Sequence, residues 1–190
     1  VEKEIKGRKY WVAGMGVPPA VLDLQCDLNA GVIEFMNGIH PFPFESWGSL
    51  ISDRFGFGGL EAYSYATYQR GWLPDIDPHE PSHTFWGGVI PNTYLTSLWN
   101  ESFADFFENY YPREGHAGNR DDLRMAFRHV ADSSESYRAW PAVSAGCESS
   151  PAASPIGYSR GGKVLGMLEQ EIGQKKMRES MATWLKTHPK

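Results

Sequence analysis

The chain of 190 residues is 41% hydrophobic and 14% aromatic, so it can bury the core of one domain. Its net charge of −5 excludes the basic surface that nucleic-acid binding needs, and no apolar run is long enough to span a membrane. The two cysteines, Cys26 and Cys147, are too few for a disulfide scaffold and lack the spacing of metal ligands. We expect a soluble protein with one domain over 1–190, and the composition leaves its compartment, cytoplasm or periplasm, open.

Residues 1–75 predict a small sheet with one long helix. Apolar periodicity and turn residues set out four elements: strands at 10–13, 47–55 and 63–68, and a helix at 21–36. The last two strands are separated by Phe57-Gly58-Gly59-Leu60-Glu61-Ala62. Because glycine has no side chain, Gly58 and Gly59 would let the backbone approach a ligand closely, and a following strand with a free edge could pair with an extended peptide.

The motif HEPSH at residues 79–83 has the spacing of a metal-binding helix. Residues four apart lie about one turn apart on the same helix face, so His79 and His83 could bind one metal ion. Glu80 would then lie beside the metal rather than on it. A carboxylate in that position can take a proton from a water molecule that the metal activates.

The residues around this motif indicate where its helix begins. Pro81 would remove a backbone donor inside a helix, so it is tolerated only in the first turn, whose amides have no helical partners. Asp77 and Glu80 form the capping-box pattern that precedes many helices. The helix is therefore predicted to begin at about Pro78 or His79.

A second helix is predicted at 95–111, and it carries Asn100-Glu101-Ser102-Phe103-Ala104. Glu101 can supply the anionic third ligand that zinc takes beside two imidazoles, which leaves a fourth position for water. Asp105 lies four residues after Glu101 on the same face. It could accept the outward N–H of a zinc-bound histidine and so fix its orientation, or it could equally be a surface carboxylate.

The remaining chain reads as helix and loop, so 76–190 is expected to be the mainly helical half. Its predicted elements are a charged helix at 121–130, a loop at 140–155, a helix at 163–168, and a basic amphipathic tail helix at 173–190. We expect the tail helix to pack against the protein rather than to bind a membrane. Gly157-Tyr158-Ser159-Arg160-Gly161 precedes the helix at 163–168.

Motifs in this order resemble the gluzincin zinc aminopeptidases, the family of aminopeptidase N and the leukotriene hydrolase. HEPSH and NESFA resemble the family's HExxH and NEGFA, although the seventeen residues between His83 and Glu101 are one fewer than in the family. Thr84-Phe85-Trp86-Gly87-Gly88 resembles QWFGN, Gly58-Gly59-Leu60-Glu61-Ala62 resembles GxMEN, and the segment at 157–161 resembles SYEKG.

The resemblance implies a thermolysin-like α+β catalytic domain that binds one zinc ion and a peptide substrate. Glu80 would be the general base, Glu61 would bind the free amine of the substrate, and Gly58 and Gly59 would border the scissile bond. Tyr158 would donate to the oxyanion, a role that suits a phenol because it is neutral near pH 7. Family members carry domains on both sides of this one, so partners could include flanking domains of a longer parent protein.

Removal of N-terminal amino acids by a metallopeptidase is the activity that the resemblance implies, and two alternatives stay open. Ala62 replaces the family's asparagine, and a cleft open at both ends would allow an endopeptidase of the same clan. An isolated catalytic domain could also bind zinc without turnover and act as a binding module.

Overall fold

The computed structural model describes residues 1–56, 58–92, 99–113, 157–158 and 160–188. They form two compact units, Val1–Thr84 and Phe85–Lys190. The helix predicted at 121–130, the loop predicted at 140–155 and Cys147 lie outside the described residues. Among the helices that are described, none combines the length and the apolar character required to cross a membrane.

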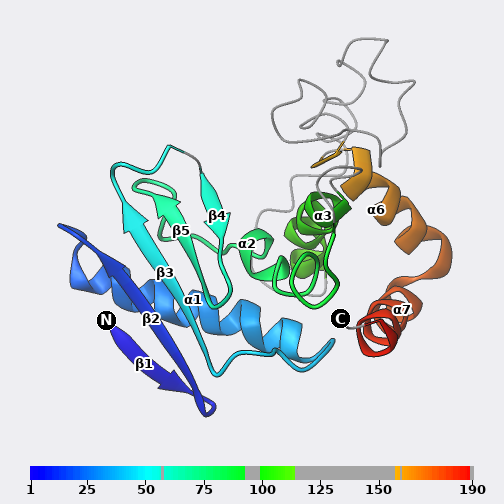
Figure 1. Cartoon of the computed structure of the whole chain (residues 1–190), viewed down its shortest axis with the longest axis horizontal. Coiled ribbons are helices and arrows are strands. Elements are labelled where there is room, and N and C mark those ends of the chain that lie inside the picture. The colour runs from blue at the N-terminus through cyan, green and yellow to red at the C-terminus, as the bar shows by residue number, and fades with distance from the viewer. Residues whose placement is uncertain (57, 93–98, 114–156, 159, 189–190) are drawn as a thin grey trace, which may run out of the picture. The chain divides into compact units, whose positions relative to one another are not determined.

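A small mixed sheet of five strands is the base of the first unit (Figure 1). The strands are β1 (Glu2–Ile5), β2 (Arg8–Gly14), β3 (Ser46–Ser52), β4 (Gly59–Glu61) and β5 (Tyr65–Gln69). Their order is β1-β2-β3-β5-β4, with antiparallel pairs at the two edges and parallel pairs in the middle. Parallel neighbours need a long crossover connection, and a helix supplies the one between β2 and β3.

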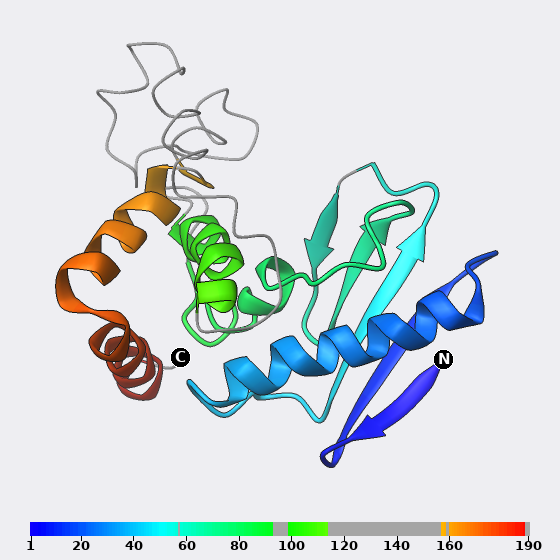
Figure 2. The ribbon, with the colours of Figure 1, turned by 180° about the vertical axis from the view of Figure 1, so that it is seen from behind.

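That crossover is α1 (Pro19–Asn37), which packs on one face of the sheet (Figure 2). Its first residue is a proline, whose missing N–H costs nothing in the first turn. The inner side of α1 buries Cys26, Val32, Ile33 and Met36. Buried side chains alternate along the three central strands, as in a half-buried sheet: Tyr10, Val12, Trp47, Ser49, Ile51, Ala66 and Tyr68. Together these residues form the core of the first unit.

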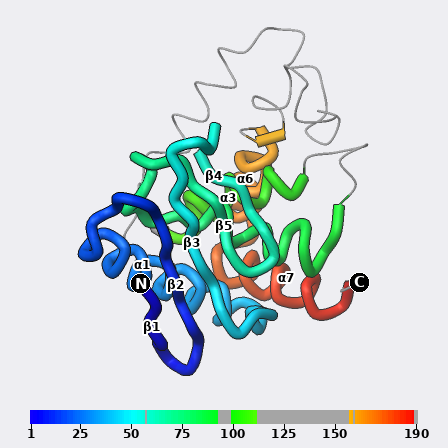
Figure 3. The backbone as a smooth tube through the Cα atoms, turned by 60° about the vertical axis from the view of Figure 1, so that its left-hand side comes forward, coloured from blue at the N-terminus to red at the C-terminus, as the bar shows by residue number. Residues whose placement is uncertain are grey.

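A hairpin of β1 and β2 forms one edge of the sheet (Figure 3). Lys6 and Gly7 connect the strands with φ values of 52° and 78°, the left-handed conformation that a type I′ hairpin turn needs at both positions. The sequence does not indicate β1, because three of its four residues are charged. Pairing with β2 makes it a strand.

At the other edge of the sheet, the structure differs from the prediction for the segment around Glu61. Residues 59–61 form β4, which pairs with β5 through Gly59 opposite Tyr68 and Glu61 opposite Ala66. The free edge therefore belongs to β4, and the predicted following strand, β5, lies between β3 and β4. A strand of three residues that begins with glycine has no periodicity to reveal it, so its pairing decides its structure.

The described part of the second unit contains α3 (Trp99–Arg113), α6 (Gly161–Ile172) and α7 (Gln174–Thr187). The helix predicted at 95–111 is confirmed over 99–111, and its first four residues lie outside the described residues. α6 packs on α3 and on α7. The tail helix packs as predicted and buries Met177, Met181 and Leu185, whereas Trp184 is 51% exposed.

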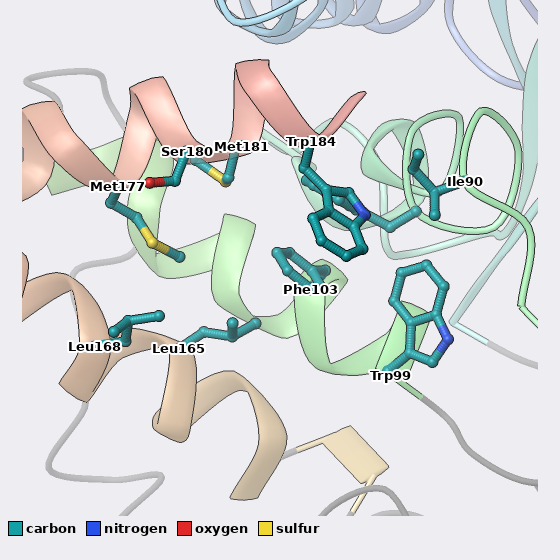
Figure 4. A pocket seen from close by; sticks show the side chains of 10 residues that line it. Ile90, Trp99, Phe103, Leu165, Leu168, Met177, Ser180, Met181 and Trp184 are labelled. Carbon is teal, nitrogen blue, oxygen red and sulfur yellow. The ribbon is translucent and has the colours of Figure 1, made fainter. Parts of the chain in front are cut away.

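Apolar side chains of the second unit line a pocket of about 530 Å³ (Figure 4). They come from all three helices: Trp99 and Phe103 from α3, Leu165 and Leu168 from α6, and Met177, Met181 and Trp184 from α7. Trp86 stacks on Phe103, with ring centroids 3.9 Å apart. The aromatic side chains at this end of α3 therefore pack against one another around the pocket.

Candidate metal centre

The HEPSH motif forms one short helical turn, α2 (His79–Ser82), and His83 continues it with helical backbone angles of φ −60° and ψ −21°. Pro81 is the third residue of the turn, where no N–H is required for a helical hydrogen bond. The imidazole rings of His79 and His83 lie close together, with centroids 5.1 Å apart. The predicted helix start and the shared face of the two histidines are both confirmed.

Asp77 precedes the N-cap residue Pro78 and accepts hydrogen bonds from this turn, which is the part of the capping-box pattern that the structure shows. Its Oδ1 accepts hydrogen bonds from the backbone N–H of His79 at 2.8 Å and from that of Glu80 at 3.4 Å. The hydroxyl of Tyr68 on β5 donates to the other oxygen, Oδ2, at 2.5 Å. Burial, and then the negative charge of Asp77, raise the pKa of Tyr68 well above its ordinary value, so the phenol stays protonated and remains a donor.

Glu80 is buried and turns its carboxylate onto β4. A Cβ atom added to Gly59 would overlap the Glu80 carboxylate, so the glycine leaves the space that this side chain occupies. Gly58 is covered in a similar way by the indole of Trp72. The two glycines therefore make room for side chains of the chain itself, and at Gly59 that side chain is the proposed general base, whereas their predicted role beside a ligand stays a prediction.

Glu61 lies on β4 next to this carboxylate. The metal-ligating atoms of Glu61, Glu80 and His83 all lie within 4.8 Å of one another, and Glu61 Oε1 is 3.9 Å from Nδ1 of His83. The first unit thus brings together two carboxylates and two imidazoles. Imidazole nitrogens and carboxylate oxygens are donors that zinc accepts, so these residues fit such an ion chemically.

The raised pKa of Glu80 predicts how the stability of the zinc-free protein changes with pH. Burial is the largest cause that raises this pKa to about 8 from 4.5, and nearby His79 counteracts the shift. Between these two values the folded state binds more protons than the unfolded state, so the free energy of unfolding falls as the pH rises. We expect a loss on the order of a few kcal/mol, which Glu80→Gln should abolish.

Urea unfolding of the zinc-free protein at about pH 5 and about pH 8 measures this loss. Glu4→Gln changes an exposed glutamate of β1 and should leave the loss as it is in the parent. An equal pH dependence in the parent and in Glu80→Gln would show that Glu80 does not carry the shifted pKa.

In the second unit, Glu101 lies in the first turn of α3 and is 3% exposed. The side-chain amide of Asn100 donates to Glu101 Oε1 at 3.3 Å, and Asn92 Nδ2 donates to Asn100 Oδ1 at 2.7 Å. Hydrogen bonds to an anionic ligand hold it in one orientation. Asn100 and Asn92 therefore support Glu101, a role that the NESFA pattern alone did not reveal.

Tyr158 precedes α6 and is held close to the turn that carries Glu101. The hydroxyl of Ser102 donates to the carbonyl oxygen of Gly157, and a Cβ atom at Gly161 would overlap the Ser102 side chain. Ser102 stands where the family motif has glycine, and Gly161 accommodates it. Asp105 lies one turn further along α3, with its Cβ against Gly162.

Similarity to a solved structure identifies the fold. The fold is that of a zinc metallopeptidase: the M1 zinc metallopeptidase from Deinococcus radiodurans matches with a TM-score of 0.65 and 18% identity, over 96% of this chain and 41% of that one. The predicted α+β metallopeptidase fold is confirmed.

The sequence is similar to those of several aminopeptidases. The membrane alanyl aminopeptidase of Heliothis virescens is 26% identical over 70% of this chain, and the glutamyl aminopeptidase of Bos taurus is 27% identical over 70%. The aminopeptidase M1 of Arabidopsis thaliana is 22% identical over 78%. The resemblance to aminopeptidases of the aminopeptidase N type is confirmed.

The chain spans 15%, 16% and 19% of the length of the Heliothis, Bos and Arabidopsis relatives. No protein-family profile matches it.

Proposed function

We propose that this chain is the catalytic domain of a zinc-dependent aminopeptidase, which removes N-terminal amino acids from peptides. One observation carries the proposal: the rings of His79 and His83 lie 5.1 Å apart, and Glu80 between them in sequence is buried beside Glu61. The names of the relatives support the same activity. Because the chain spans a small part of their length, a longer parent protein with flanking domains is part of the proposal.

We assign the zinc ligands to His79 and His83 of the first unit and Glu101 of the second. Two imidazoles and one carboxylate, with a position left for water, are the ligands of catalytic zinc in many hydrolases. When bound, the ion supplies a Lewis acid that polarises the scissile carbonyl and lowers the pKa of water. Asp105 would accept the outward N–H of a ligand histidine and so hold the ring in position.

The reaction then depends on three side chains. Glu80 takes the proton of the attacking water and passes it to the leaving amine. Tyr158 donates a hydrogen bond to the carbonyl oxygen as it becomes negative. Glu61 pairs with the free ammonium group of the substrate, while the backbone of Gly58 and Gly59 borders the scissile bond.

Glu61 distinguishes an exopeptidase from an endopeptidase. Replacing it by glutamine removes the charge that pairs with an ammonium group, and a hydrogen bond to a charged group contributes roughly 1.5–3 kcal/mol. We expect Glu61→Gln to raise KM for amino-acid arylamides by about tenfold to a hundredfold. Hydrolysis of N-acetylated substrates should be slow in the parent and should change little in the variant.

The measurement is a panel of free-amine and N-acetylated arylamides, run together with metal analysis of the same samples. Glu45→Gln, an exposed glutamate of the same unit, is the matched control. Equal rates on free and acetylated substrates would favour the endopeptidase alternative and remove the amine-binding role of Glu61. One zinc per chain without hydrolysis of either substrate would favour the inactive binding module.

A further inference from the structure

Buried polar side chains form a continuous series of hydrogen bonds from α1 to the start of α2. Gln25 Nε2 donates to Asn29 Oδ1, and Asn29 Nδ2 donates to the Ser49 hydroxyl on β3, both at 2.9 Å. Ser49 is hydrogen-bonded to Tyr68 on β5, and the Tyr68 hydroxyl donates to Asp77. We call these five residues the buried polar network. Four of them, all except Asp77, are 0–4% exposed.

The network holds the loop before α2 at two places. Gln25 clamps the backbone of Asp75, because its Oε1 accepts from the Asp75 N–H and its Nε2 donates to the Asp75 carbonyl, each at 2.9 Å. Two residues later, Asp77 accepts from the N–H groups of His79 and Glu80. The loop that leads into the metal-binding motif is thus tied to α1 and to the sheet through side chains.

We propose that the buried polar network positions His79 and Glu80 for metal binding and catalysis. It connects the rigid sheet to the first two N–H groups of α2, so a displacement of Tyr68 or Asp77 would turn the helix that carries the motif. This inference rests on the proposed function, because it takes His79 as a zinc ligand.

The network is costly to bury, which argues that it does more than fill the core. A buried polar group loses its water, and it regains that free energy only when each donor finds an acceptor. The bond from Tyr68 to the Asp77 carboxylate is charge-assisted, and such bonds are short and directional. A fully satisfied buried network fixes one arrangement of its members, whereas apolar side chains of the same size would tolerate several.

Tyr68→Phe tests this positioning role, because it removes one hydroxyl and keeps the ring that packs in the core. Tyr65→Phe is the matched control, since Tyr65 lies on the same strand, is 37% exposed and stands outside the network. We expect Tyr68→Phe to weaken zinc binding by about tenfold, measured by chelator competition. In the zinc-free protein, the amides of His79 and Glu80 should exchange hydrogen at least about tenfold faster.

Hydrogen exchange and zinc affinity together distinguish a failure of the network proposal from a failure of the proposed function. Unchanged exchange at His79 and Glu80 overturns the proposal, and so does faster exchange with unchanged zinc affinity, because the network would then serve stability alone. A parent protein that binds no zinc contradicts the proposed function, and the exchange rates then decide by themselves whether the network positions α2. If Tyr68→Phe does not fold, Asp77→Asn replaces it: the amide keeps an acceptor for α2 but loses the charge that Tyr68 contacts.

Discussion

Replacing Glu80 by glutamine is expected to lower kcat by about 100-fold to 10,000-fold while the zinc content stays the same. Glutamine has the shape of glutamate, so it fits the space that Gly59 leaves open. Its amide cannot accept a proton from the attacking water, whereas the carboxylate can. Hydrolysis of amino-acid arylamides, with bound zinc determined on the same sample, measures both quantities.

The control for this substitution is Glu4→Gln, which removes the same charge at an exposed position of β1 in the same unit. A Glu80→Gln protein that binds zinc and hydrolyses at the parental rate would exclude Glu80 as the base. Loss of zinc in that variant would have a different meaning. It would make Glu80 a metal ligand together with its neighbours Glu61 and His83, whose ligating atoms lie within 4.8 Å of it and of one another.

The features that sequence analysis predicted correctly depend on short-range geometry. The four-residue spacing of His79 and His83 places their rings together through one helical turn, and Asp77 accepts a hydrogen bond from the His79 N–H two residues away. The helix α1 was predicted because its apolar residues repeat at helical spacing. Local backbone geometry fixes all of these features, so the order of residues is sufficient to find them.

The features that were missed depend on partners far apart in the sequence. β4 is a strand because it pairs with β5, and Asn29 meets Ser49 across 20 residues because α1 packs on β3. Neither contact leaves a periodic signal. The sequence shows that Ser102 replaces the glycine of the family motif. Its hydrogen bond to Gly157 cannot be predicted from that, because the bond forms only where α6 packs on α3.

Glu101→Ala is expected to weaken zinc binding by more than about 100-fold, because even the groups behind metal ligands contribute 10- to 100-fold. The substitution removes the anionic ligand and leaves the Asn100 amide without the oxygen to which it donates. Chelator competition gives the affinity, and thermal unfolding of the zinc-free variant separates loss of the ligand from loss of the fold. Glu171→Ala, an exposed glutamate on α6, is the matched control in the same unit.

The Glu101 variant also decides between two ligand sets. If zinc still binds with parental affinity, the carboxylate ligand belongs to the first unit, where Glu61 and Glu80 already lie beside His83. Glu61→Gln and Glu80→Gln would then lose the metal, and hydrolysis would need another base. If zinc is lost only in Glu101→Ala and in the histidine variants, the ion joins ligands from both units. Glu80 is then left free to act on water.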